Sequence, residues 1–501
     1  MFPLELGSED QFAALRGLLQ QAGYTEAAVC QRLTLKNIYD FKIVGNETPL
    51  SPEIPDAAAL LTRLLLEGGY ITEQQMNGFL GPGALEILLG LGLVAPEPPE
   101  AERWSATALL YPMRDLYIAS DRAHNAGGAE FIWPTDIVYP AIMPNTDLFL
   151  SLLPDTPCDA FLDLCCGTGI AALATARMAH QAWAADIAGR CTHFAEFNRR
   201  LNGIANVTVA ESDVYQAVGG QTFDRIAVHP PYVPVFKPQW IFDSGGEDGE
   251  HVTRRVVEGL PAHLRPGGRL YCLAMGSDRD QPFELRLREW LGNEQAEFDV
   301  GFFVRKALDP AQYAARSVLA RHGSAEEVHA FQEQFRRLDI RSLVYGLIVV
   351  QRRETPRATF TARRQRAEAV GRAESEWLMS WETAAACGDI VDRILRSRLT
   401  ARTNCNLRIR HRLEAGEWTP ADCALETDHP FPMEAKVQPA IAQMLARCDG
   451  SKTALEHLAE LKAEGLMHPD TTADAFAELL KIMISGGFLE IEAHRLPLHP
   501  P

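Results

Sequence analysis

Short apolar runs alternate with helical patterns through the middle of the chain. Residues 160–164, 181–185, 207–210 and 223–228 are the apolar runs, and stretches with apolar side chains at helical spacing separate them. A short apolar run bounded by turn residues predicts a buried strand, and strands that alternate with helices predict a parallel sheet. We therefore expect an α/β, doubly wound domain that binds its ligand across the carboxyl ends of the strands.

The two ends of the chain show helical patterns instead. Apolar side chains recur at helical spacing in residues 1–100, and Thr72 is a suitable N-cap within them. Residues 431–501 read as helix, turn, helix, helix and short strand. We expect both segments to be winged-helix-like domains, with a linker at Pro96–Glu100. The N-terminal domain either holds substrate or covers one face of the central domain, and the C-terminal domain is expected to dock a partner or form a homodimer.

The central domain is assigned to residues 101–355, and two of its parts are less regular. Leu109–Asp121 is expected to form paired strands with a turn at Pro112. A polar helical insertion over about 309–337 precedes the last strand. This insertion is either a lid at the carboxyl ends of the strands or a solvated helix pair without a role.

The first apolar run leads into a glycine turn, Asp163-Leu164-Cys165-Cys166-Gly167-Thr168-Gly169. Glycine lets the backbone bend sharply and approach a ligand, and the turn delivers that ligand to the unpaired N–H groups of a helix N-terminus. The third glycine of the dinucleotide-binding fingerprint is absent, because Ala172 stands there. Asp186 follows about 20 residues later, where an acid can accept both hydroxyls of a ribose.

With later residues, these features resemble the class I S-adenosylmethionine-dependent methyltransferases, and more narrowly the release factor glutamine N5-methyltransferase group. The resemblance covers about residues 105–355. It implies a Rossmann-like sheet of seven strands and S-adenosyl-L-methionine as the cofactor. Beyond the glycine turn and Asp186, the segments that carry it are Met143–Asp147, Ser212-Asp213, Pro230-Pro231-Tyr232, Phe242–Gly249 and Leu264–Leu270.

The resemblance assigns cofactor roles to acids at the ends of the strands. It places Asp163 near the methionine ammonium group, Asp186 at the ribose hydroxyls and Asp213 at the adenine amino group, with help from the Val214 backbone. The two turn glycines would let the backbone pass the methionine moiety. The remaining cofactor contacts that it implies are Cys165, Gly167, Thr168, Gly169, Ile187, His229 and Thr146. Thr146 is equally a candidate N-cap for a helix over 147–153.

The catalytic residues implied by the resemblance are His229, Pro230 and Tyr232. In the family pattern Asn-Pro-Pro-Tyr, the Asn oxygen and a Pro carbonyl accept hydrogen bonds from the target NH2 group, and the aromatic ring stacks on its plane. His229 stands where the family has Asn. An imidazole can accept one such bond, but it can also take a proton near neutral pH. This departure leaves open an acceptor other than glutamine, including another amine or an oxygen or carbon nucleophile.

Composition narrows the class of protein. The 501 residues carry a formal charge of −18 and are 47% hydrophobic, which argues against non-specific binding to nucleic acid or acidic membranes. The ten cysteines are scattered and form no CxxC pair, as expected of reduced thiols. Neither a signal peptide nor a bilayer-spanning run is evident. We expect a cytoplasmic protein without a metal site.

Residues 356–430 differ in charge and are expected to form an Arg-rich helical connector. Two clusters of arginines lie in and around them, and such clusters either bind an anionic substrate, RNA or an acidic partner, or pair with local acids. The clusters are Arg352, Arg353, Arg357, Arg363, Arg364 and Arg366, and then Arg393, Arg396, Arg398, Arg402, Arg408, Arg410 and Arg412.

The sequence therefore predicts a methyltransferase and leaves its acceptor open. The first hypothesis is N-methylation of a protein or peptide side chain. A small metabolite and an RNA base are the alternatives, of which the acidic charge disfavours RNA. A cofactor-binding interaction protein that no longer methylates is the remaining hypothesis.

Overall fold

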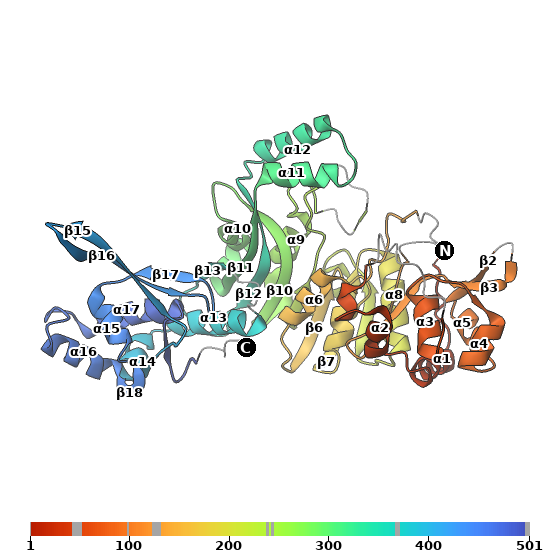
Figure 1. Ribbon diagram of the computed structural model, residues 1–501, viewed down its shortest axis with the longest axis horizontal. Coiled ribbons are helices and arrows are strands. Elements are labelled where there is room, and N and C mark those ends of the chain that lie inside the picture. Colours follow the sequence, from red (N-terminus) through yellow and green to blue (C-terminus); the bar gives the residue numbers. More distant parts are fainter. Residues whose placement is uncertain are drawn as a thin grey trace. The chain divides into compact units, whose positions relative to one another are not determined.

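The computed structural model describes residues 2–42, 53–97, 100–122, 132–236, 240–241, 245–365 and 371–495 (Figure 1). Pro98 and Pro99 of the expected linker, the expected family segment 242–244 and Arg366 lie outside the described residues. The chain divides into two compact units, which are described separately. The first comprises Met1–Phe283, Trp290–Gly292 and Leu308–Leu343, and the second comprises Glu284–Glu289, Asn293–Ala307 and Val344–Pro501.

The first unit begins with helices whose ends are encoded locally. Ser8 caps the first helix, and the side chain of Gln11 returns a bond to the Ser8 backbone, which closes a capping box. The apolar face of that helix is buried, as its periodicity predicts. These elements are α1 Glu9–Gln21, α2 Glu26–Leu33 and η1 Ile38–Asp40.

A compact helix–strand module follows. Its order is helix, strand, helix, helix, strand, strand, and its antiparallel sheet has the order β1-β3-β2. Thr72 caps α4 and forms a capping box with Gln75, which confirms the predicted N-cap. The elements are α3 Ala57–Leu65, β1 Ile71–Thr72, α4 Glu73–Leu80, α5 Ala84–Gly90, β2 Val94–Glu97 and β3 Glu100–Ala106.

The expected pair of strands after this module exists, but its turn was misplaced. Leu109–Met113 (β4) and Leu116–Ser120 (β5) form an antiparallel hairpin in which Pro112 lies inside the first strand. The turn is made by Arg114 and Asp115, which both have positive φ, 49° and 62°. A two-residue hairpin turn of this kind needs positive φ at both positions, which the proline ring forbids.

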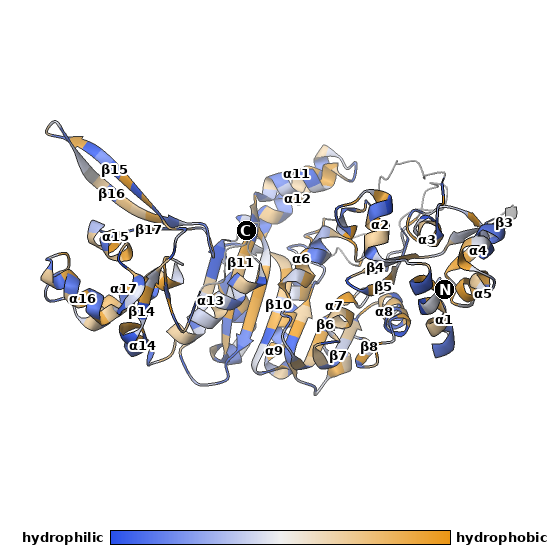
Figure 2. Ribbon diagram, turned by 60° about the horizontal axis from the view of Figure 1, so that its bottom comes forward, coloured by the Kyte–Doolittle hydropathy of each residue, from blue (hydrophilic) through white to orange (hydrophobic). Residues whose placement is uncertain are grey.

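The central sheet confirms the doubly wound expectation. In the first unit its strands run parallel in the order β10-β9-β6-β7-β8. Figure 2 shows β6 and β10 as largely hydrophobic ribbons, as expected of strands buried in a sheet core. The strands are β6 Cys158–Leu164, β7 Ala179–Asp186, β8 Val207–Glu211, β9 Phe223–Val228 and β10 Leu264–Asp278. The connecting helices are α6 Pro144–Leu152, α7 Ile170–Thr175, α8 Gly189–Leu201, η3 Gln216–Val218 and α9 His251–His263.

The sheet has eight strands rather than the seven expected. Its strands in the second unit have the order β13-β11-β12, and the additional strand, β13, pairs in parallel with β11 from Val300↔Thr361 onward. Sequence pattern did not reveal β13 because only Ala362 of its five residues is buried. The elements are α10 Phe283–Trp290, η4 Gly292–Glu297, β11 Phe298–Leu308, β12 Ser342–Arg352 and β13 Thr361–Gln365.

The helical insertion is present. Its helices are α11 Pro310–Leu319 and α12 Ala325–Arg337, within the first unit. Asp309 caps α11, and Ser324 with Glu327 forms a capping box on α12. The predicted boundaries of about 309–337 are confirmed, because an N-cap residue in the sequence marks the start of each helix.

The expectation of a helical connector over residues 356–430 was wrong for its second half. Helices α13 Arg372–Ala385 and α14 Ile390–Arg396 occur, but β15 Asn406–Glu414 and β16 Glu417–Thr427 form a long antiparallel hairpin. Its turn residues Ala415 and Gly416 have φ of 50° and 90°. Along β15, arginines alternate with apolar residues at the period of a strand. The large number of arginines made this alternation hard to recognise in the sequence.

The chain ends in a second helix–strand module, and its three-stranded sheet has the order β18-β14-β19. The three helices and the final short strand follow in the order predicted from the sequence, but the segment expected as a turn after the first helix forms a strand, β18. The elements are β14 Arg398–Ala401, β17 Met433–Lys436, α15 Pro439–Leu445, β18 Asp449–Thr453, α16 Ala454–Ala463, α17 Ala473–Ser485 and β19 Leu489–Ile491.

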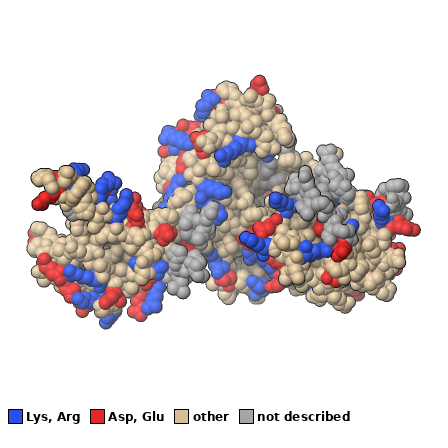
Figure 3. All heavy atoms as spheres, viewed as in Figure 1, with Lys and Arg blue, Asp and Glu red and all other residues tan. Residues whose placement is uncertain are grey.

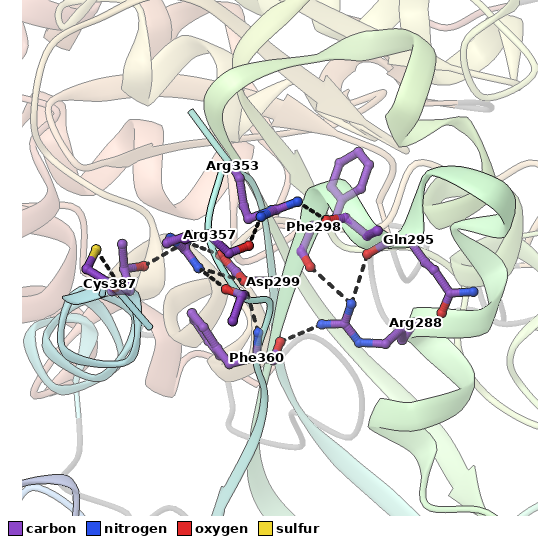
Figure 4. A network of polar contacts seen from close by, with 11 residues as sticks. Arg288, Gln295, Phe298, Asp299, Arg353, Arg357, Phe360 and Cys387 are labelled. Atoms are coloured by element: carbon purple, nitrogen blue, oxygen red, sulfur yellow. Dashed lines mark hydrogen bonds and ion pairs between the residues drawn. The ribbon is translucent and has the colours of Figure 1, made fainter. Parts of the chain in front are cut away.

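A buried ion pair fixes the additional strand to its neighbour (Figure 4). The carboxylate of Asp299, in β11, is fully buried and accepts two bonds from the Arg357 guanidinium, one of them at 3.1 Å. Asp299 also accepts from the Phe360 backbone N–H at 3.1 Å. Arg288 donates to the carbonyl oxygens of Phe298 and Phe360, which lie at the starts of β11 and β13. Arg288 and Arg357 therefore attach β13 to β11 in addition to the backbone hydrogen bonds between the two strands.

We expect Arg357→Met to destabilise the second unit by about 3–5 kcal/mol, because it leaves the Asp299 carboxylate buried without its partner. Arg396→Met is the matched control, since Arg396 pairs with Asp392 on an exposed helix surface, and its cost should stay within about 1 kcal/mol. Urea unfolding of both variants, followed by circular dichroism, measures the difference. Equal losses in the two variants would contradict the role of the buried pair.

Candidate functional site

The predicted site residues converge at the carboxyl edge of the parallel sheet. Leu164 of β6 lies opposite Ala185 of β7 and Val228 of β9, so the residues that follow these strands leave the sheet at one level. Asp186 of β7 likewise lies opposite Glu211 of β8. The glycine turn, Asp186, Asp213 and His229 therefore share one edge, as parallel strands require.

The glycine turn is closed by bonds to the neighbouring strand. The Cys166 N–H donates to the Ala185 carbonyl at 3.1 Å, and the Gly167 N–H donates to Asp186 Oδ2 at 2.9 Å. Cys165, Gly167 and Gly169 all have positive φ. A Cβ on Gly169 would lie 3.0 Å from the Ala195 Cβ, whereas a Cβ on Gly167 would meet nothing within 4 Å. Gly169 is thus required by helix packing, and Gly167 borders open space.

A buried amide that the sequence analysis missed supports this turn from behind. Asn198, in α8, is fully buried and donates to the Thr168 carbonyl at 3.0 Å. The same side chain bonds both the N–H and the carbonyl of Ala119 in β5. Thr168 itself is buried, so its side chain faces the protein. An asparagine inside an otherwise ordinary amphipathic helix gave no signal of this role.

Two carboxyl groups at the edge are buried. Asp163 is 2% exposed and accepts one bond, from the Ala172 N–H at 3.1 Å. Burial raises the pKa of Asp163 to about 8. Asp186 is 9% exposed, and burial raises its pKa although the N–H groups of Gly167 and Ala188 donate to it. Negative charge at this edge is therefore costly until a cation or further donors arrive.

Asp213 differs from these two acids because it is already paired. Arg255 of α9 donates to both of its carboxylate oxygens, at 2.8 and 2.9 Å. This guanidinium holds the pKa of Asp213 below its usual value. An open groove runs past the pair, lined by Asp213, Val214, Tyr215, Gln216, Gly219, Arg255 and His263. Arg255 is a second residue that sequence reasoning missed. Ile187, directly after Asp186, is 51% exposed.

His229 lies between two aromatic rings. Its ring is stacked on Phe149 at 5.2 Å between centroids and on Tyr232 at 5.6 Å. Its Nε2 atom is buried and has no hydrogen-bond partner. Burial lowers the pKa of His229 to about 4, so the imidazole is neutral at physiological pH. The site therefore contains a buried, neutral imidazole whose Nε2 atom can still form a hydrogen bond with a ligand.

Helix α6 contributes two side chains to the surroundings of His229 and Tyr232. Phe149 contacts His229, and one turn earlier the Asn145 Nδ2 donates to the Tyr232 hydroxyl at 3.3 Å. Residues four apart share a helix face, which explains why both reach the Pro-Pro-Tyr turn. The N-cap of α6 is Met143, so the expectation that Thr146 caps the helix was wrong. Pro144 starts the helix two residues before Thr146, because proline suits its first turn.

The arginine clusters are largely neutralised within the protein. Figure 3 shows basic and acidic side chains interspersed on the visible face. Most of the clustered arginines form ion pairs: Arg352–Glu297, Arg357–Asp299, Arg363–Glu284, Arg364–Glu382, Arg396–Asp392, Arg402–Glu490, Arg408–Glu434 and Arg412–Glu414. This arrangement favours the interpretation in which the clusters pair with local acids.

The described residues contain no helix that is both long and apolar enough to cross a bilayer. They also contain no group of three or more His, Cys, Asp and Glu side chains placed to hold a metal ion.

Comparison with known proteins identifies relatives of the central region. The family described as methyltransferase small domain matches residues 141–304. A ribosomal protein uL3 glutamine methyltransferase of Bradyrhizobium diazoefficiens is 32% identical over 171 residues, 31% of this chain and 53% of the relative. A release factor glutamine methyltransferase of Moorella thermoacetica is 30% identical over 29% of this chain and 54% of its own. This chain thus spans about half the length of these two relatives.

A third relative is covered more completely. The release factor glutamine methyltransferase of Cereibacter sphaeroides is 31% identical over 200 residues, 36% of this chain and 70% of the relative. The family match to residues 141–304 includes the parallel strands β6 to β10 on which the site is built.

Burial of Asp163 makes stability depend on pH. Its pKa is about 8 in the folded chain and about 4 in an unfolded one, so the folded state holds a proton that the unfolded state releases. This group therefore lowers the free energy of unfolding as pH rises from about 4 to 8, by up to about 1.4 kcal/mol per pH unit.

We expect Asp163→Asn to remove that slope, so that the variant melts higher than the wild type at pH 8. Asp159→Asn is the matched control, an acid on the same strand whose side chain is 86% exposed, and it should keep the wild-type slope. Thermal melting between pH 5 and pH 8 measures the slopes of both variants. This range covers most of the interval between the unfolded and folded pKa values of Asp163, about 4 and about 8. An unchanged slope in Asp163→Asn would show that Asp163 is already ionised when folded.

Proposed function

This chain belongs to the release factor glutamine methyltransferase family, and we propose that it transfers a methyl group from S-adenosyl-L-methionine to a nitrogen of a protein side chain. The observation that carries the proposal is the single carboxyl edge that brings the glycine turn, Asp186 and His229 together. The relatives above, named as glutamine methyltransferases, support a protein amide as the acceptor.

The residues at the edge fit the cofactor. The open space at Gly167 admits a ligand close to the backbone. Asp163 is a buried carboxyl group without a cation, which suits the ammonium group of the methionine moiety. Asp186 retains lone pairs for the ribose hydroxyls, and Asp213 with Val214 would meet the adenine. We assign Cys165, Thr168, Gly169 and Ile187 to the walls of this site, and Thr146 to the helix that borders it.

The chemistry requires little more than positioning. When bound, the cofactor supplies a methyl group on a positively charged sulfur, which is already activated for transfer. The protein has to hold the acceptor nitrogen in line and exclude water. His229, neutral and with an unpartnered Nε2, can accept a hydrogen bond from the acceptor NH2 group. The Pro230 carbonyl would accept the second bond, and the Tyr232 ring would stack on the amide plane.

The flanking modules complete the proposal. We assign the helix–strand modules within residues 1–100 and 431–501 as winged-helix-like domains, on the order of their elements. We propose residues 101–355 as the methyltransferase domain and 356–430 as a connector whose strand β13 joins the sheet of that domain. The C-terminal module would dock a protein or a second copy of the chain. A substrate among the proteins of translation would place the enzyme in the cytoplasm.

Transfer of label from S-adenosyl-L-methionine tests the proposal. We expect the enzyme to label a protein fraction when a lysate of cells lacking its gene is incubated with the tritiated cofactor. Asp186→Ala should abolish this labelling and weaken cofactor binding in calorimetry about tenfold or more, because it removes charge-assisted hydrogen bonds. Label confined to RNA or to small molecules would overturn the protein acceptor, and cofactor binding without any label would overturn catalysis.

Substitutions of His229 test how the acceptor is held. We expect His229→Asn, which restores the family residue, to keep activity within about tenfold of the wild type, whereas His229→Phe should lose about a hundredfold or more. Phenylalanine preserves the stacking with Phe149 and Tyr232 but has no nitrogen, so it separates the two properties of the ring. Initial rates of label transfer measure both variants.

Because its pKa is about 4, His229 should cause no loss of rate between pH 6 and pH 8, an interval far above that value. A full-rate His229→Phe enzyme would show that the imidazole nitrogen is not used.

A further inference from the structure

The α11–α12 insertion is bound to the segment that follows the Pro-Pro-Tyr turn. Gln334, in α12, is 7% exposed, and its side-chain amide donates to the Glu247 carbonyl at 2.8 Å and to the Val235 carbonyl at 3.3 Å. These carbonyls belong to two strands of backbone that pair with each other, since the Val235 N–H donates to Gly246 and the Gly245 N–H donates to Val233. One buried amide therefore bridges both arms of this loop.

Further contacts make the attachment more than a single bond. Arg337 donates to both carboxylate oxygens of Glu247 at 2.9 Å. Phe331, fully buried in α12, packs on Phe236 with 6.1 Å between ring centroids. The guanidinium of Arg321, just after α11, lies 5.9 Å from the centre of the Trp240 ring. The insertion consequently contacts this loop at Val235, Phe236, Trp240 and Glu247, so its helices are packed on the protein.

The held loop forms part of an apolar surface beside the turn, which we call the aromatic surface. It consists of Ile132, Trp133, Tyr139, Trp240 and Ile241. Trp133 lies 5.6 Å from Trp240 and 5.9 Å from Tyr139, between ring centroids, and the Ile241 N–H donates to the Thr135 carbonyl at 2.9 Å. Ile132 is 86% exposed and Ile241 40%. Aromatic and aliphatic side chains gathered this way on a surface mark an interaction site.

Along the chain, the aromatic surface adjoins both elements that carry the proposed acceptor site. Tyr139 lies on the segment that leads directly into α6, whose Asn145 bonds Tyr232. Trp240 lies on the loop that leaves Tyr232 itself. We infer that a polypeptide whose side chain is held at His229 and Tyr232 passes along Tyr139 and Trp240.

We propose that the α11–α12 insertion and the aromatic surface form a binding site for the polypeptide segment around the methylated side chain. This inference rests on the proposed function and adds the place at which the acceptor polypeptide binds. Gln334 and Arg337 act as positioning residues that keep the loop in place, and Trp133 and Trp240 provide the contact area.

A polypeptide fits this surface better than a nucleic acid does. Trp, Tyr and Ile side chains supply the apolar anchors that dominate protein interfaces, with Arg321 at their border. Single-stranded RNA would need a positively charged groove to follow its phosphates. Arg337, the basic residue at this loop, is already paired with Glu247. The charge of −18 on the whole chain also opposes a polyanion.

Removal of the two tryptophans tests the surface. We expect Trp133→Ala with Trp240→Ala to raise the concentration of lysate protein that gives half-maximal label transfer by about tenfold or more, because aromatic anchors dominate interface affinity. The maximal rate and the affinity for S-adenosyl-L-methionine should be unchanged. Leu285→Ala is the control, since Leu285 is 42% exposed on α10, outside the proposed binding site, and it should behave as the wild type.

The outcomes separate this inference from the proposed function. If the wild type labels protein and the double variant labels it with the same half-saturation, the surface does not bind the acceptor and the proposed function stands. If the wild type labels RNA and the double variant loses that labelling, the occupant is a nucleic acid and the polypeptide is refuted. If the wild type labels nothing while it binds the cofactor, the proposed function fails and this inference fails with it.

A second variant tests the positioning role. Gln334→Leu removes the donor and keeps the size, so hydrogen exchange at the Val235 and Gly245 amides should become faster. Half-saturation by lysate protein should rise in parallel, with cofactor affinity unchanged. Gln332→Leu is the control, because Gln332 bonds only the Ala311 carbonyl inside the insertion. Faster exchange without a change in half-saturation would reduce Gln334 to a structural residue and refute its role in acceptor binding.

Discussion

The carboxylate of Asp186 is the point on which the site depends. Its side chain accepts from the Gly167 N–H in the turn after β6 and from the Ala188 N–H before α8, while its carbonyl accepts from Ser212 after β8. One residue thus aligns the ends of three strands. These three bonds use backbone donors, and the Cys191 thiol adds a side-chain bond to the same carboxylate.

The same edge concentrates destabilising features. Asp163 is buried with one backbone donor, the turn places Cys165 at positive φ, and Nε2 of His229 has no partner. Each of these costs free energy in the folded chain. Folding tolerates them because the strands behind the edge are continuous apolar runs whose burial provides the stability. A ligand that supplies a cation and hydrogen-bond donors would relieve two of the three.

The sequence predicted what the backbone encodes locally and missed what depends on tertiary partners. Glycine spacing, short apolar runs and capping residues located the turn, the parallel strands and the α11–α12 insertion. Asn198 and Arg255 could not be recognised, because an amide or a guanidinium in a helix carries no mark of what it will contact. The β15–β16 hairpin was hidden for another reason. Its first strand, β15, is exposed at every residue, so arginines occupy the alternate positions where a half-buried strand would show polar and apolar faces.

The low pKa of the His229 imidazole follows from its neighbours. An exposed imidazole would be partly protonated near neutral pH and would repel the positively charged sulfur of a bound cofactor. Here Phe149 and Tyr232 cover the ring and keep it neutral. Phe149, one turn from Asn145 on α6, therefore contributes to the burial that keeps the His229 imidazole neutral.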